Sequence, residues 1–243
     1  DIDDTLTTDG RLKSNAYTAL ENLSNSGFIV IPVTGRCAGW CDHIARMWPV
    51  NGVVGENGAF FFSYDHQSKK MQQTYCQTPK ERKENHLALH EIKKTILKNV
   101  SGSALASDQD YRHTDLAIDF AEDVATLSSN KIKEIVTIAE NAGAIAKVSS
   151  IHVNCWIGSH NKLSTSLTTL EQVFGVSNSN IQNEVLFIGD SPNDSMMFDY
   201  FNKSVGVANV MDFIKELDKP PKYITLNHSG EGFVELADSL LRR

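Results

Sequence analysis

Apolar and amphipathic segments alternate near both ends of the chain. Residues 28–33 form an apolar run, which is typical of a strand buried between two layers of helices. From residue 14 to 26 the apolar positions recur at helical spacing, and Gly27 then provides a stop. A second buried strand is predicted over 184–188. Strands that alternate with helices predict a doubly wound, Rossmann-like α/β core around a parallel sheet.

Further elements complete this predicted core. A short helix is expected to carry Trp40, Ile44 and Met47 on one face. A strand over 52–55 leads into the turn signal Asn57-Gly58, which predicts a hairpin. The other predicted elements are hairpin strands over 60–62 and 71–75, helices over 162–174, through Met196, Met197 and Phe201, near 210–217 and from 231 onward, and strands over 204–208 and 223–225.

The pattern changes between about residues 79 and 156. A long charged helix over 80–100 precedes a strand over 115–120, a helix over 129–142, and strands over 144–149 and 151–157. Alternating rather than solid apolar patterning predicts an antiparallel sheet with helices on one face. We therefore predict a core of residues 1–78 and 157–243, interrupted by an inserted α+β cap domain of residues 79–156.

Charge and composition narrow the functional class. The chain has 243 residues, a formal net charge of −7 and a pI near 5.6, which argues against a nucleic-acid-binding protein. No targeting peptide or long apolar run is visible, so a cytoplasmic protein without a membrane partner is expected, as a monomer or homodimer. A buried strand is expected ahead of Asp1, so we expect that the sequence lacks its first residues.

The cysteines are too few and too scattered for a disulfide scaffold. Cys37 and Cys41 lie one helical turn apart with His43 nearby, an arrangement that could be taken for a metal site. A closed zinc site needs four ligands, usually with closer spacings. A packed helix face with free thiols is the favoured interpretation.

Oxygen-rich side chains follow the predicted core strands. Ligands bind at the carboxyl ends of the strands in open α/β sheets, so these side chains are expected to share one site. Carboxylates without thiol or imidazole partners favour Mg²⁺, and a carboxylate can act as a covalent nucleophile in phosphoryl transfer. Taken singly, each segment could also be an ordinary turn. The residues are Asp1 and Asp3, Thr34 and Gly35, and Asp190 and Asp194. Lys162 begins the helix that precedes the strand before Asp190.

Four motifs in order resemble those of the haloacid dehalogenase superfamily of phosphatases. They are the segment 1–7 (DIDDTLT), the segment 33–36 (VTGR), Lys162, and the segment 189–194 (GDSPND). The large insert and the segment 56–59 (ENGA) resemble the Cof-type or sucrose-phosphatase-like branch, which carries an α+β cap. This resemblance implies a Mg²⁺-dependent phosphatase that acts on a small phosphorylated metabolite, most plausibly a sugar phosphate, through an aspartyl-phosphate.

The resemblance also implies a role for each motif residue. Asp1 corresponds to the nucleophile and Asp3 to the acid/base, whose pKa is expected to be high because two neighbouring carboxylates resist joint ionisation. Mg²⁺ would be held by Asp1, by Asp3 through its backbone carbonyl, by Asp190, and by Asp194 in or just behind the first shell. Phosphate-binding residues would be Thr34, Gly35, Lys162 and Asn193. Lys162 is preferred over Lys147 because it begins a helix at the core boundary.

Substrate recognition is expected from the insert. Alternation along 151–157 places His152, Asn154 and Trp156 on one face, which could line the cleft or face solvent. Arg112 and His113 are further candidates. Two core residues, Glu56 and Asn57, are expected near the leaving group.

Several other activities remain open from the sequence. A phosphomutase of the same branch would keep every motif. A receiver-like signalling module would need neither Asp3 nor the insert. A non-catalytic protein that binds a phosphorylated metabolite would not depend on Asp1. A phosphonate hydrolase typically has a lysine in its cap, and a haloacid hydrolase lacks the second acid, so Asp3 argues against the latter.

Overall fold

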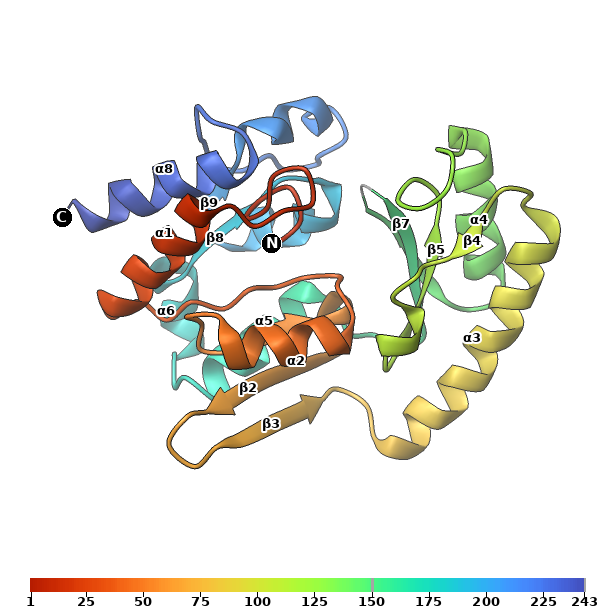
Figure 1. Ribbon diagram of the computed structural model, residues 1–243, viewed down its shortest axis with the longest axis horizontal. Helices are drawn as coiled ribbons and strands as arrows, with labels where there is room; N and C mark the ends of the chain where they lie inside the picture. The colour runs from red at the N-terminus through yellow and green to blue at the C-terminus, as the bar shows by residue number, and fades with distance from the viewer. Residues whose placement is uncertain (150, 243) are drawn as a thin grey trace.

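The computed structural model describes residues 1–149 and 151–242, so Arg243, the end of the predicted core range, lies outside the described residues. One body of the molecule contains both ends of the chain, and the segment from α3 to β7 forms a second body beside it (Figure 1). Each body has its own cluster of buried apolar side chains, with two clusters in the first body and one in the second.

The first half of the core is built from two helices and a three-stranded sheet. Its elements are α1 (Ser14–Asn25), α2 (Ala38–Met47), β1 (Val53–Gly55), the 3-10 turn η1 (Glu56–Gly58), β2 (Phe60–Asp65) and β3 (Lys70–Tyr75). The strands form an antiparallel sheet in the order β1-β2-β3. Glu56 and Asn57 both have positive φ in the turn that joins β1 to β2.

The second half of the core contains the parallel strands. Its elements are α5 (Lys162–Gln172), α6 (Asn178–Glu184), β8 (Leu186–Gly189), η3 (Pro192–Asp194), α7 (Ser195–Tyr200), β9 (Lys203–Gly206), η4 (Ala208–Phe213), β10 (Tyr223–Ile224) and α8 (Ser229–Leu241). The strands pair in parallel in the order β10-β9-β8. Helices α1 and α8, from opposite ends of the sequence, lie side by side (Figure 1).

The inserted segment folds as an antiparallel sheet covered by two helices. Its elements are α3 (Pro79–Asn99), β4 (Ala104–Leu105), η2 (Gln109–Tyr111), β5 (Asp115–Asp119), α4 (Ser129–Asn141), β6 (Ile145–Val148) and β7 (His152–Trp156). The strand order is β4-β5-β7-β6, and α3 and α4 lie on the side of the sheet away from the core (Figure 1). The sheet therefore turns its other face toward the core.

The predicted fold class, an α/β core with an inserted α+β unit, is confirmed, but its first predicted strand is irregular. The segment 28–33 is extended and only Val33 forms a bridge, parallel to Val54 of β1. Val54 donates its N–H to the carbonyl of Pro32, while Pro32 has no N–H to return. Phe28 and Ile29 are exposed, so the run is buried only at its carboxyl end.

Three smaller predictions need correction. Trp40 and Met47 are exposed, and α2 buries Ala38, Cys41 and Ile44 instead. The helix predicted near 210–217 is the 3-10 turn η4, and α6 was not predicted at all. Cys37 and Cys41 are buried free thiols and His43 is exposed, which supports the packed-face interpretation.

Candidate active site

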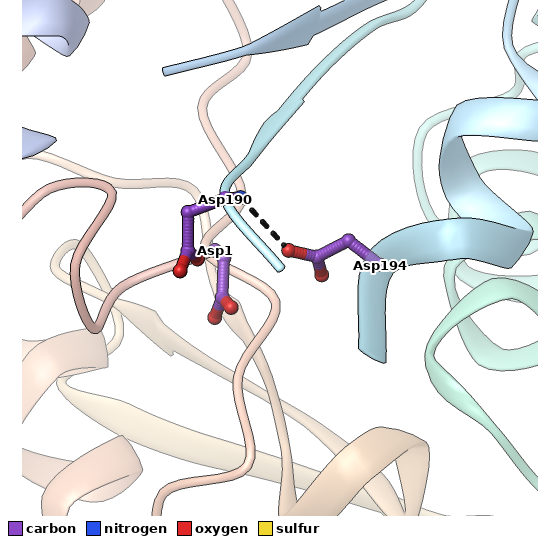
Figure 2. Close-up of side chains that lie close together, drawn as sticks. All are labelled: Asp1, Asp190 and Asp194. Carbon is purple, nitrogen blue, oxygen red and sulfur yellow. Dashed lines mark hydrogen bonds between the residues drawn. The ribbon is translucent and has the colours of Figure 1, made fainter. Parts of the chain in front are cut away.

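Three aspartates from two distant segments of the chain lie close together (Figure 2). Asp1, Asp190 and Asp194 each offer an oxygen, and these atoms lie within 4.8 Å of one another. Asp190 follows β8, and its N–H donates to Oδ2 of Asp194 at 3.2 Å, so the turn after the strand fixes both acids. The backbone nitrogen of Asp1 donates to the carbonyl of Ile188 at 2.8 Å, which holds Asp1 against β8.

Burial disfavours the negative charge of this cluster. Asp190 and Asp194 are nearly inaccessible to solvent. Burial, reinforced by the negative charge of Asp194, raises the pKa of Asp190 to about 7. Thr5 partly offsets this effect, because its hydroxyl donates to Oδ1 of Asp190 at 3.0 Å. A cation that neutralised these carboxylates would therefore stabilise the cluster.

Lys162 supplies one such positive charge. It is the first residue of α5, and its side chain is 5% exposed. Its Nζ lies 2.9 Å from Oδ1 of Asp194 and 3.1 Å from Oδ2 of Asp1. Asn161 caps the helix by accepting from the N–H of Ser164, which fixes the backbone where the lysine begins. Lys147, the alternative candidate, lies exposed on β6 in the inserted segment.

The carboxylate of Asp3 faces an arginine and stands apart from the three clustered acids. Nε of Arg36 donates to its Oδ2 at 2.9 Å, and Nη2 donates to its Oδ1 at 2.9 Å. Burial alone would lower the pKa of Arg36, but this pairing with Asp3 raises it. Nη1 also reaches Oε1 of Glu122 in the inserted segment at 3.4 Å. Asp3 therefore has a partner of opposite charge, which the prediction from its neighbouring carboxylates did not include.

The segment Thr34-Gly35-Arg36 runs beside the acids. Thr34 is fully buried, and its Oγ1 accepts from the N–H of Arg36 at 3.0 Å. Gly35 leaves room for the neighbouring amides, because a Cβ there would lie 3.2 Å from Nδ2 of Asn154 and 3.2 Å from Oδ1 of Asn57. Asn193 lies in the turn η3, where its Oδ1 accepts from Ser191 at 3.0 Å and from Lys162 at 3.5 Å.

A cavity between the two bodies is lined by several of these groups and by side chains of the inserted segment. His152 and Asn154 of β7 face this cavity, while Val153 and Cys155 pack into the apolar cluster behind the sheet. Trp156 is buried elsewhere, stacks on His160 and donates from Nε1 to its carbonyl. The lining residues are Asp1, Asp3, Gly35, Arg36, Asp190, Ser191 and Asn193 from the core, and Arg112, Ser149, Ile151, His152 and Asn154 from the inserted segment.

Some expected substrate contacts lie elsewhere. Glu56 is fully buried and accepts from the N–H groups of Ala38, His113 and Thr114, so it joins the core to the inserted segment. His113 is exposed and contacts the hydroxyl of Tyr75. Asn57 is buried beside Gly35 and does not line the cavity. The expectation that Glu56 touches a leaving group is therefore wrong.

Glu122 was not predicted from the sequence. It lies in the loop after β5 and joins Arg36 to His152, whose Nε2 is 2.9 Å from its Oε2. Burial lowers the pKa of His152, although Glu122 opposes this effect. Nothing in the local sequence marks Glu122, because its role depends on the approach of β7 and the core loop.

The fold and the site define an α/β domain with an inserted α+β unit and a cluster of carboxylates beside β8. The model of the haloacid dehalogenase-like hydrolase family matches residues 1–235, so the chain belongs to this family. It is 24% identical over 246 residues to a phosphoglycolate phosphatase of Methanobrevibacter smithii, covering 99% of this chain and 96% of the relative.

Solved structures share the fold. The structure of Thermoplasma acidophilum 0175 superposes with a TM-score of 0.74 at 18% identity, covering 98% of this chain and 95% of that chain. A sugar phosphatase of subclass IIB of the superfamily has a TM-score of 0.65 at 14% identity, covering 99% and 96%. The resemblance to the Cof-type branch is confirmed. Two of these similar proteins are phosphatases by name, which supports the prediction that this family member is a phosphatase. None of the described helices has the length and apolar character that crossing a bilayer requires.

Proposed function

We propose that the protein is a Mg²⁺-dependent phosphatase that hydrolyses a small phosphorylated metabolite, with a sugar phosphate as the favoured substrate. The observation that carries the proposal is the convergence of Asp1, Asp190 and Asp194 beside Lys162 and the cavity. In this proposal residues 79–156 act as the cap domain over a core formed by the rest of the chain. The protein acts in the cytoplasm, as a monomer or homodimer.

The acidic cluster fits a hard divalent cation. It combines three carboxylates with the ammonium group of Lys162, so the buried carboxylates outnumber the lysine that pairs with them. Mg²⁺ prefers oxygen ligands, often one or two carboxylates together with a phosphate. Asp1, Asp190 and Asp194 would hold the ion, and Asp3 would contribute its backbone carbonyl, since its carboxylate pairs with Arg36. When bound, the ion would neutralise charge on the phosphoryl group.

The side chains divide the proposed reaction between them. An oxygen of Asp1 attacks phosphorus, the bond to the leaving oxygen breaks, and Asp3 gives that oxygen a proton. Asp3 then takes a proton from a water molecule that attacks the aspartyl-phosphate, which releases phosphate and restores Asp1. Lys162, Thr34, Gly35 and Asn193 hold the phosphoryl oxygens, and Lys162 also orients Asp1 at 3.1 Å.

The charge of the cavity wall supports a neutral leaving group. Both arginines of the lining are already paired, Arg36 with Asp3 and Glu122, and Arg112 with two aspartates. A carboxylate on the leaving group, as in phosphoglycolate, would meet no free guanidinium there. Hydroxyl groups suit the amide of Asn154, which is 5% exposed and carries an Oδ1 without a partner.

A phosphate-release screen tests the proposal. Purified protein is incubated with sugar phosphates, phosphoglycolate and p-nitrophenyl phosphate, with Mg²⁺ or with EDTA. We expect Mg²⁺-dependent release that is fastest with a sugar phosphate and is lost in Asp1→Asn. Release that EDTA leaves unchanged would contradict the metal assignment. Conversion of a sugar phosphate into its isomer without free phosphate would identify a mutase instead.

A further inference from the structure

The backbone carbonyls of the segment Thr34–Arg36 all accept hydrogen bonds. The carbonyl of Thr34 accepts from the N–H of Asn57 at 3.0 Å, and that of Arg36 accepts from the N–H of Glu56 at 3.1 Å. Both donors belong to the turn η1 of the core. The carbonyl between them, on Gly35, accepts from Nη1 of Arg112 at 3.1 Å. The middle carbonyl of this segment is therefore held from the inserted domain.

Arg112 is fixed firmly enough to transmit the position of that domain. Its side chain is 1% exposed. Nε and Nη2 donate to the two oxygens of Asp108, each at 2.9 Å, and Nη1 donates to both oxygens of Asp115 at 3.0 Å. A planar guanidinium can serve several acceptors in one rigid arrangement, which an ammonium cannot reproduce. The same Nη1 bonds Asp115 and Gly35, so β5 and the core segment share one donor group.

The peptide that Arg112 holds also sets the proposed phosphate contacts. The carbonyl of Gly35 and the N–H of Arg36 belong to one planar unit, so fixing the first orients the second. The N–H of Arg36 donates to Oγ1 of Thr34 at 3.0 Å. The Thr34 hydroxyl then accepts through its oxygen and keeps its own hydrogen for a phosphoryl oxygen. A Cβ at Gly35 would lie 3.2 Å from side-chain atoms of both Asn57 and Asn154, so this position has little space for a side chain.

We propose that Arg112 is a positioning residue that couples docking of the inserted domain to the phosphate-binding segment Thr34–Arg36. This inference rests on the proposed function, because it assigns that segment to the phosphoryl group. Arg112 acts through Gly35 and so affects how tightly phosphate is held. It does not discriminate between leaving groups. A residue that only stabilised the fold would change the folded fraction and leave the phosphate affinity of the folded protein unchanged.

Two variants test the proposal. Arg112→Lys keeps a positive charge beside Asp108 and Asp115 but loses the planar guanidinium that binds both. Arg112→Gln/Asp115→Asn removes the cation together with the fully buried acid, so that no unpaired charge remains at Asp115. Asp110→Asn is the control, since Asp110 is exposed in the adjacent turn. Thermal melting establishes that each protein is folded. Calorimetric titration with orthophosphate in the presence of Mg²⁺ then gives the dissociation constant, and steady-state kinetics give KM and kcat.

We expect the orthophosphate dissociation constant to rise about tenfold in both variants, which is the loss of roughly one hydrogen bond to a charged group. KM should rise by the same factor for p-nitrophenyl phosphate and for a sugar phosphate, and the control should match the wild type. Folded variants with unchanged orthophosphate affinity would overturn the inference. A loss confined to the sugar phosphate would also overturn it, because it would mean direct contact with the leaving group.

The two proposals fail in different ways. Wild-type protein that binds orthophosphate but hydrolyses no phosphate ester would refute the proposed function, and the comparison of Arg112 variants would still stand. Wild-type protein that hydrolyses esters, paired with variants of unaltered affinity, would refute only the role of Arg112. Wild-type protein that binds no orthophosphate would refute the assignment of the segment and the inference with it.

Discussion

Replacing Glu56 with glutamine should weaken the junction between the core and the inserted segment. Its Oε1 accepts from the N–H groups of Ala38 and His113, each at 2.9 Å, and its Oε2 accepts from the N–H and hydroxyl of Thr114. In Glu56→Gln an amide nitrogen, which is a donor, replaces one of these oxygens. Because the threonine hydroxyl can rotate, the least costly orientation leaves one backbone N–H unpaired and weakens the other bonds by removing the charge.

The expected loss of unfolding free energy is about 3 kcal/mol, from about 2 kcal/mol for the unpaired buried N–H and about 1 kcal/mol for weaker bonds to a neutral acceptor. Urea unfolding followed by tryptophan fluorescence measures it. Glu84→Gln, at an exposed glutamate 3.9 Å from Lys80, is the matched control and should change stability by less than about 0.5 kcal/mol. A loss below about 1 kcal/mol in Glu56→Gln would refute the claim that this side chain fastens the two parts.

Three further outcomes follow from the site and its surroundings. Lys162→Met should lower kcat/KM at least about a hundredfold, and Mg²⁺ should raise its melting temperature more than that of the wild type, because the ion replaces the lost charge; equal shifts would contradict this. Asn154→Ala should lower kcat/KM more for a sugar phosphate than for p-nitrophenyl phosphate, and equal losses would remove Asn154 from recognition. Burial lowers the pKa of His160 to about 4, so its contribution to stability is present above pH 6.5 and is lost as the pH falls toward 4. Between pH 7 and pH 4.5 the wild type should lose about 2 kcal/mol more of its free energy of unfolding than His160→Gln, as measured by urea unfolding. If the unfolding free energies of the two proteins fell in parallel with pH, His160 would not be the group responsible.

Local patterns predicted the elements that are built from local signals. Helix α3 begins at a Thr78 capping box followed by Pro79, and β7 alternates as expected between an apolar face and one that carries His152 and Asn154. The motif residues also come from short segments at strand ends. For this reason the acidic cluster could be anticipated without any knowledge of the tertiary structure.

What the sequence did not reveal depends on contacts between distant segments. Phe28 and Ile29 are exposed because they precede the residues that reach β1. The apolar character of the segment 28–33 therefore did not predict which of its residues are buried. Glu56 and Arg112 are polar residues whose roles arise only where the inserted segment meets the core. The pairing of Arg36 with Asp3 likewise joins two loops that no sequence spacing relates.

Trapping the covalent intermediate tests the central claim most directly. Asp3→Ala is mixed with radiolabelled p-nitrophenyl phosphate, whose phenolate leaves without needing a proton, and the reaction is stopped with acid. The account predicts label on the protein that hydroxylamine releases, and no label when Asp1→Asn is added to the same variant. Label that persists without Asp1, or protein that turns over substrate and never carries label, would contradict it.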